Sequence, residues 1–128
     1  MVLITGDTHT AWAFEATNKP FEEYDAKTGK GAFAVEFGTT SINSSNSNER
    51  YPDSLVRMHE TKIVNSEINP HLKFTNMRDH GYLVLELTPD KATAYFKFME
   101  TIKESGNYEF KEIIKYYVNS GETRLRTE

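Results

Sequence analysis

The sequence contains no cysteine, and this absence excludes disulfide bonds and thiolate metal ligands. No apolar run approaches the roughly 20 residues that a membrane-spanning helix needs. Acidic residues outnumber basic ones, and with a formal net charge of −4 there is no basic footprint for nucleic acid. The amino terminus has no basic region followed by a long apolar stretch, so no signal peptide is expected. What is present is a chain of 128 residues, at most one domain, that is long enough to bury a core.

The opening segment, residues 2–12, carries the clearest chemical signal. Residues 2–5 are a short, mostly apolar run, which predicts a strand buried on both faces. Gly6 allows a sharp bend at the end of that strand and a close approach of backbone to a ligand. Asp7 and His9 follow, and both residue types bind metals well, the carboxylate favouring harder ions. Because ligands of open α/β sheets gather at the carboxyl ends of strands, Gly6-Asp7-x-His9 predicts part of a metal site.

This segment resembles the Gly-Asp-x-His motif near the C-terminal end of PhoD-like alkaline phosphatases, which belong to the calcineurin-like metallophosphoesterases. Other stretches similar to that family are spread over nearly the whole chain, although only the first motif is chemically specific. They are Ala11-Trp12, Ala34-Val35-Glu36-Phe37, Thr39 to Ser45, Asn69 to Phe74, Gly81 to Leu85 and Val118 to Gly121. The resemblance therefore implies the last part of a much longer enzyme.

The resemblance implies a metal-dependent phosphatase or phosphodiesterase that hydrolyses phosphate esters through a dinuclear metal site. It implies Asp7 and His9 as metal ligands, with Ca, Fe, Mn or Zn as candidate ions. Relatives take most of their ligands from upstream motifs, so the chain alone is expected to bind metal weakly and to be catalytically incomplete. The alternative is a catalytically inactive β-rich binding or interaction module derived from that fold. Dimerisation that rebuilds a closed sheet is a further possibility.

Full-length relatives are often exported to the periplasm or secreted, whereas nothing in this chain indicates its localisation. A Met placed directly before a core strand is unusual. It favours a truncated gene, an expression fragment or a deliberately small protein.

Three residues, Gly6, Trp12 and Glu36, are candidates for shaping the site around the two ligands. Trp12 is most simply a core anchor, and a wall of a substrate pocket is the second interpretation. Glu36 is the one ionisable group in the apolar run 32–37 and could orient a metal ligand. The simpler interpretation of Glu36 is a solvent-facing or ion-paired strand residue.

Alternation of apolar and polar residues predicts strands at residues 32–37, 71–74, 81–87, 92–99 and 110–118. Phe33, Val35 and Phe37 should share one face of the first of these strands. The strands at 81–87 and 92–99 should pair antiparallel through their short linker. The charged tail from Glu122 is expected to be an edge strand or frayed.

Helical spacing of apolar residues predicts one good helix over residues 53–67, with Asp53 as its cap. The stripe expected to face the core consists of Leu55, Met58, His59, Ile63 and Val64. His59 is interpreted as a partly buried helix residue, and His71 and His80 as surface residues, rather than as ligands. Residues 10–17 could start a short helix or stay extended, and the Ser/Asn-rich residues 38–50 predict a surface loop.

These elements predict the α/β class, or α+β by a strict count, with all of residues 1–128 in a single C-terminal part of a PhoD-like phosphatase domain. We expect a mixed, mostly antiparallel sheet with one main helix. With the family resemblance, this is about half of a four-layer α/β/β/α sandwich. The face left open by the missing half favours self-association.

Overall fold

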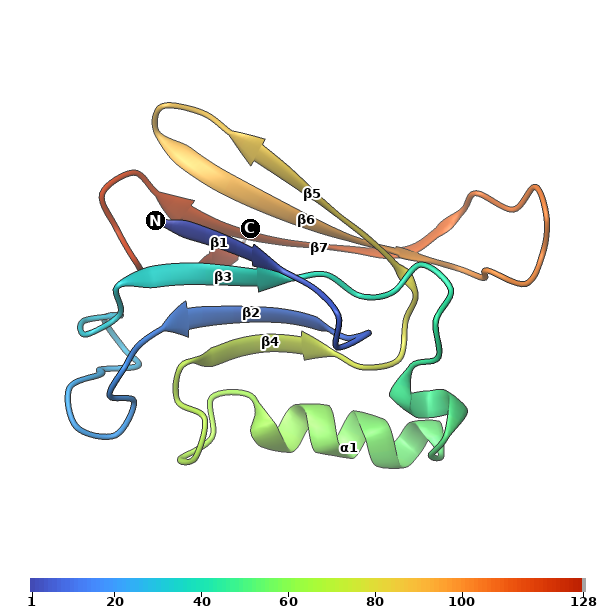
Figure 1. The fold of residues 1–128 in the computed structure, drawn as a ribbon, viewed down its shortest axis with the longest axis horizontal. Helices are drawn as coiled ribbons and strands as arrows, with labels where there is room; N and C mark the ends of the chain where they lie inside the picture. The colour runs from blue at the N-terminus through green and yellow to red at the C-terminus, as the bar shows by residue number, and fades with distance from the viewer. Residues whose placement is uncertain (128) are drawn as a thin grey trace.

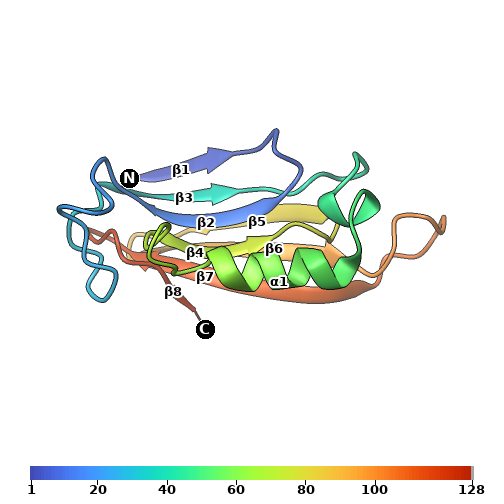
Figure 2. The ribbon, with the colours of Figure 1, turned by 90° about the horizontal axis from the view of Figure 1, so that it is seen from below.

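The structure of the protein is a computed structural model that describes residues 1–127. Two four-stranded sheets pack against each other, and one α-helix runs beside them (Figures 1 and 2). The elements are, in order, β1 (Val2–Thr5), β2 (Ala11–Ala16), β3 (Ala34–Gly38), the 3₁₀ helix η1 (Ser47–Glu49), α1 (Asp53–Ile63), β4 (Leu72–Asn76), β5 (Gly81–Leu87), β6 (Lys91–Met99), β7 (Phe110–Asn119) and β8 (Arg126–Thr127). The expected mixed α+β class is confirmed, although the strands are divided between two sheets.

The first sheet has the order β1-β3-β2-β4, so that β3 lies between two strands that precede it in the sequence. β3 is parallel to β1 and antiparallel to β2. Gly38, at the carboxyl end of β3, lies opposite both Thr5 of β1 and Trp12 of β2. The loop that joins β1 to β2 therefore crosses the carboxyl ends of β1 and β3.

The second sheet has the order β5-β6-β7-β8, and each of its strand pairs is antiparallel. The predicted pairing of residues 81–87 with residues 92–99 is confirmed, with Gly81 opposite Phe98 and Leu87 opposite Ala92. The tight connection between these strands makes the antiparallel arrangement the natural one. β8 is a two-residue edge strand within the charged tail.

The hydrophobic core lies between the two sheets, and each sheet contributes both alanines and large aromatic rings to it. Its buried members are Ala11, Ala13, Val35, Phe37, Ala92, Ala94, Phe96, Phe98, Val118 and Leu125. Phe96 contacts Phe37 and Phe74 at ring-centroid distances of 6.2 and 5.1 Å. Such contacts between tilted or perpendicular rings add to the stabilisation from burial.

Two expectations for the first sheet are wrong. β1 is not buried on both faces, because it is the edge strand of its sheet, and Ile4 is 59% exposed. Trp12 is not a core anchor but a half-buried residue that stacks on Phe14 with ring centroids 5.7 Å apart. Residues 11–16 are extended, so that alternate side chains of β2 face opposite ways. The core positions of this strand are occupied by Ala11 and Ala13.

Other predicted boundaries shift by a few residues. β3 begins at Ala34, so Phe33 precedes it and is 48% exposed, while Val35 and Phe37 face the core as expected. α1 ends at Ile63 instead of Glu67. No helix in residues 1–127 is long and apolar enough to cross a membrane.

The apolar stripe predicted for α1 is wrong except at the end of the helix, where Ile63 and Val64 are half-buried. Figures 1 and 2 place the helix alongside the β4 edge of the first sheet, where it has a narrow contact with the body. Val56 and Glu60 are its buried residues, whereas Leu55 and Met58 are 46% and 59% exposed. His59 is exposed rather than partly buried. Sequence periodicity predicted a broad buried face, whereas the helix lies at the edge of the sheet and fully buries only two side chains.

The start of α1 differs from the prediction as well. Pro52 is the cap residue and Asp53 is the first helical residue, which forms an i,i+4 ion pair with Arg57 at 2.5 Å. Pro is favourable at this end of a helix, where the backbone N–H groups have no partner within the helix. Glu60 pairs with Arg78 through two contacts of 2.9 and 3.1 Å.

Two histidines expected at the surface are largely enclosed. His71 is half-buried and stacks on Phe14 with ring centroids 5.6 Å apart. Its Nδ1 atom is buried without a hydrogen-bond partner among residues 1–127. The His80 side chain is 14% exposed and lies 3.3 Å from the carboxylate of Glu49. Each ring contacts a residue that is distant in the sequence, Phe14 for His71 and Glu49 for His80, so the sequence alone does not reveal that these histidines are enclosed.

Candidate metal-ligand loop

The loop between β1 and β2 carries the two predicted metal ligands. Asp7 has a φ of +73° and His9 a φ of +59°, both in the left-handed region. Gly6 is not among the residues with positive φ, so the sharp bend expected there is made by Asp7 and His9. Non-glycine residues in this region are uncommon and cost free energy, although Asp and His tolerate it better than most. Strain of this kind often concentrates at functional sites, which makes this loop the candidate.

A contact to the next loop fixes the ring of His9. Its Nδ1 lies 3.1 Å from the backbone carbonyl oxygen of Ser45. A carbonyl oxygen only accepts hydrogen bonds, so Nδ1 carries the proton and donates it. In the neutral ring the Nε2 atom then has a free lone pair. A backbone carbonyl behind one ring nitrogen is the usual support for a histidine that binds metal through the other.

Further hydrogen bonds hold the loop over the strand ends. The backbone N–H of Thr39 donates to the Thr5 carbonyl at 3.0 Å, and the Thr40 hydroxyl donates to the His9 carbonyl at 3.3 Å. The indole N–H of Trp12 donates to the Thr8 hydroxyl at 3.1 Å. Trp12 thus contacts the loop between the two candidate ligands through Thr8, although it is not part of the core.

Glu36 lies on β3, on the face of the sheet turned away from the second sheet. It accepts a hydrogen bond of 2.7 Å from the hydroxyl of Thr5 and lies opposite Phe14 on β2. Thr5 precedes Asp7 by two residues, so Glu36 is linked to the loop through the end of β1. The structure gives Glu36 no hydrogen bond or ion pair to Asp7 or His9.

The two predicted ligands are suited to a metal but do not complete a site. Both side chains are exposed, and the Asp7 carboxylate has no hydrogen-bond or ion-pair partner among residues 1–127. In that part of the chain no three His, Cys, Asp or Glu side chains form a group that could hold a metal ion. An unpaired carboxylate and a histidine with its lone pair available fit the donor chemistry of a divalent or trivalent ion. Further donors would have to come from elsewhere.

A cavity of about 210 Å³ lies directly beside His9, between this loop and the segment that leads into α1. Its lining residues are Thr8, His9, Thr10, Ser45, Asn46, Ser47, Arg50 and Tyr51. Sequence reasoning missed Asn46 and Arg50, because residues 38–50 read as a polar surface loop. One signal was available: Asn46 and Glu49 have the spacing of a capping box, and the Asn46 N–H does donate to Glu49 at 3.2 Å.

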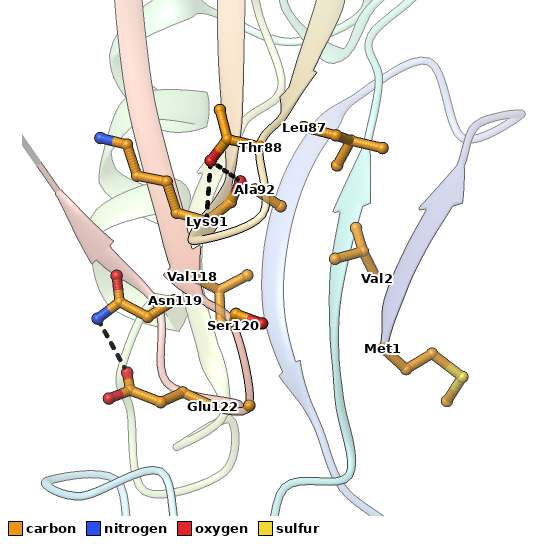
Figure 3. Close-up of a pocket in the computed structure, with 11 residues that line it drawn as sticks. Met1, Val2, Leu87, Thr88, Lys91, Ala92, Val118, Asn119, Ser120 and Glu122 are labelled. Carbon is orange, nitrogen blue, oxygen red and sulfur yellow. Dashed lines mark hydrogen bonds between the residues drawn. The ribbon is translucent and has the colours of Figure 1, made fainter.

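A second cavity, of about 200 Å³, lies at the opposite end of β1 (Figure 3). It is formed by Met1 and Val2 together with the turn between β5 and β6 and the end of β7. Its polar groups are hydrogen-bonded to each other: the Thr88 hydroxyl donates to the Lys91 carbonyl at 3.1 Å, and Asn119 donates to Glu122 at 3.3 Å. The strained loop with Asp7 and His9 lies at the other end of β1 and remains the candidate site.

Comparisons with known proteins identify the family of the chain and a similar fold. Residues 1–96 match the family described as PhoD-like phosphatase. The fold is similar to a solved structure described as the structure of PhoD, with a TM-score of 0.66 and 25% sequence identity. That match covers 98% of this chain and 22% of the solved chain, so this chain spans about a fifth of that protein's length. A search of curated proteins finds no match. The chain belongs to the PhoD-like phosphatase family.

Proposed function

We propose that this chain is the C-terminal portion of a metal-dependent phosphatase or phosphodiesterase, and that Asp7 and His9 are two ligands of its dinuclear metal site. The observation that carries the proposal is the strained loop at the carboxyl ends of β1 and β3, which lies within the family match. Ligand sites at the carboxyl ends of strands are a general feature of open sheets. The Asp7 carboxylate has no hydrogen-bond or ion-pair partner among residues 1–127, so no side-chain contact in that part of the chain explains its strained backbone.

Each residue has a definite role in this proposal. Asp7 supplies a negative oxygen donor, and His9 supplies the lone pair of Nε2 because its Nδ1 is committed to the Ser45 carbonyl. Gly6 and Trp12 act on the loop rather than on the ion. Trp12 holds Thr8, the residue between the two ligands, and Glu36 steadies the end of β1 through Thr5.

When bound, two metal ions would polarise phosphoryl oxygens and make water more acidic, which is the chemistry that hydrolysis of a phosphate ester needs. Ca, Fe, Mn and Zn are the candidate ions. Asp7 and His9 would fill two coordination positions, and the remaining protein donors would come from the part of the enzyme outside this chain. We therefore propose weak metal binding, and phosphate-ester hydrolysis only in the complete site.

The second candidate is a binding or interaction module that keeps the fold without the reaction. It is favoured by β1, which pairs with β3 alone among residues 1–127 and so has one open edge. Met1 and Ile4 on or beside this strand are 70% and 59% exposed. Open edges with exposed apolar residues recruit further strands, so this candidate predicts self-association or pairing with another chain.

The experiment is a titration of the chain with Mn²⁺, followed through the paramagnetic broadening of its backbone and histidine NMR signals. Broadening should begin at Asp7 and His9 and disappear from this loop in Asp7→Asn and His9→Gln. His59→Gln is the matched control, because His59 is an exposed histidine on α1 away from the loop. Equal broadening in all three variants would contradict the assignment of the ligands.

Activity separates the two candidates. Hydrolysis of p-nitrophenyl phosphate is measured, with added Ca²⁺, Fe³⁺, Mn²⁺ or Zn²⁺, in the complete enzyme that contains this chain, because the chain alone is proposed to lack the remaining ligands. Turnover that falls in Asp7→Ala and His9→Ala supports the phosphatase, and turnover unchanged in both variants contradicts the site. Sedimentation of the chain itself tests self-association through the open β1 edge, which a strictly monomeric chain would exclude.

A further inference from the structure

The cavity beside His9 has one feature that the metal ligands do not explain. Asn46 lines it and is 2% exposed, yet its side-chain Nδ2 atom has no hydrogen-bond partner among residues 1–127. A buried amide without a partner is unfavourable, and such groups need an explanation. The Oδ1 atom of the same side chain accepts a hydrogen bond from the Ser41 hydroxyl at 3.0 Å, which orients the amide.

Other donors line the same cavity. The guanidinium of Arg50 has neither an ion-pair nor a hydrogen-bond partner among residues 1–127, and it carries up to five N–H donors. Tyr51 adds a hydroxyl that is likewise unpaired within those residues. Arg50 differs in this from Arg57, Arg78 and Arg126, each of which has a carboxylate partner.

The charge of this cavity is opposite to that of the chain. No Asp or Glu is among its lining residues, so Arg50 gives it a positive charge within a chain of formal net charge −4. A cavity with unpaired amide and guanidinium donors and no carboxylate suits an anion with several oxygens. Its volume of about 210 Å³ is below the roughly 300–1,000 Å³ of pockets for drug-sized ligands, which fits one small anionic group.

We propose that this cavity binds the phosphoryl group of the substrate through Asn46 and Arg50. The inference rests on the proposed function, because the phosphoryl group would lie beside His9, which that function makes a metal ligand. His9 lines the cavity on one side, and its position is fixed by Ser45, which also lines the cavity. The Nδ2 amide of Asn46 and the Arg50 guanidinium would each donate to a phosphoryl oxygen. Both donors belong to the chain itself, so anion binding requires no metal.

The test is a titration of ¹⁵N-labelled protein in EDTA, first with inorganic phosphate and then with phenyl phosphate. The side-chain NH₂ signals of Asn46 and the Nε–H signal of Arg50 should shift and saturate with both ligands. An ester that binds at least as well as free phosphate identifies a substrate site, and binding of free phosphate alone identifies a general anion site, which contradicts the proposal. Arg50→Gln should weaken binding by about tenfold, the loss expected for a charge-assisted hydrogen bond.

Two further variants keep the result interpretable. Arg50 is exposed, so its replacement leaves the fold intact, and Arg57→Gln removes an exposed arginine outside the cavity as the matched control. Asn46→Asp preserves the shape of the side chain and should abolish binding by placing a carboxylate against the anion. Binding that is unchanged in Arg50→Gln and Asn46→Asp, or absent from the wild-type chain, overturns the inference.

Failure of this inference can be told from failure of the proposed function. Mn²⁺ broadening at Asp7 and His9 without any phosphate response removes the anion site and leaves the metal ligands. Phosphate binding in EDTA that is lost in Arg50→Gln, without Mn²⁺ binding to the loop, leaves the anion site and removes the metal ligands.

Discussion

The carboxylate of Glu15 accepts a hydrogen bond of 2.8 Å from the backbone N–H of Leu125, 110 positions later in the chain. Glu15 is 1% exposed on β2, and it also accepts the hydroxyl hydrogen of Tyr24 at 2.5 Å and lies 3.9 Å from the Lys73 ammonium. Burial and the neighbouring Glu15 carboxylate raise the pKa of Tyr24 well above its usual range, so the tyrosine stays a donor. One buried carboxylate thus joins the first sheet to a long loop and to the tail.

Replacing Glu15 by Ala should therefore destabilise the protein strongly. Tyr24, Lys73 and the Leu125 N–H would lose a buried acceptor together, and we expect the free energy of unfolding to fall by about 3–5 kcal/mol in urea titrations. Glu86→Ala is the matched control, because Glu86 also accepts a tyrosine hydroxyl, that of Tyr95 at 2.8 Å, but is exposed. Its loss should cost less than about 1 kcal/mol. Similar losses in both variants would contradict the role assigned to Glu15.

The strained backbone of the candidate site predicts a trade-off between stability and function. Asp7→Gly removes the penalty of a positive φ, so the free energy of unfolding should rise by up to about 1 kcal/mol while Mn²⁺ binding is lost. Thr8→Gly is the control, because Thr8 lies in the same loop without a positive φ and should lose stability instead. Thermal unfolding of the two variants distinguishes these outcomes. A destabilised Asp7→Gly would show that the carboxylate has a structural role.

Gly81 should tolerate no side chain. A Cβ atom at this position would lie 2.0 Å from the Lys97 carbonyl oxygen on the neighbouring strand, which is backbone and cannot move aside easily. We expect Gly81→Ala to lower the free energy of unfolding by about 3 kcal/mol. Gly6→Ala is the comparison, because a Cβ atom there would be 3.7 Å from a Thr39 methyl group and the backbone has no positive φ. Gly6→Ala should be nearly neutral in stability.

His71 predicts a loss of stability in mild acid. Burial, and then the nearby Lys73 charge, lower the pKa of His71 below its usual value. A group whose pKa is lower in the folded state stabilises the protein fully above its unfolded pKa, here about 6.5, and that contribution is lost as the pH falls toward the folded pKa. The free energy of unfolding should therefore fall more steeply below pH about 6.5 in the wild type than in His71→Phe. Parallel pH profiles for the two proteins would contradict this prediction.

The strands were predictable where one sheet face meets the core and the other meets solvent. Residues 81–87 and 92–99 alternate clearly, and their pairing follows from the short turn between them. β1 and α1 were less predictable, because both lie at edges. The apolar residues of β1 read as a buried strand, and those of α1 as a core stripe, whereas Ile4 and Met58 are exposed. Sequence patterns report how apolar an element is, and its position at an edge depends on the whole topology.

For the candidate site, the sequence identified the two candidate ligands but not the residues that surround them in the fold. Asp7 and His9 stand out by their spacing after a strand, and their role as ligands stays a prediction. Arg50 and Asn46 could not be connected to them, since some 40 residues and two strands of the same sheet separate the two segments in the chain. The contact between His9 and Ser45 that brings the segments together is a product of the tertiary fold.

The insertion of β3 between β1 and β2 has a consequence for the order in which the protein assembles. The loop with Asp7 and His9 spans a gap that stays empty until residues 34–38, over twenty positions beyond it, enter the sheet. Bringing segments so distant in the sequence together costs conformational entropy before any contact compensates for it, and pairing of such strands is slow. A nascent chain would thus contain Asp7 and His9 early and hold them at their final separation only after β3 has entered the sheet.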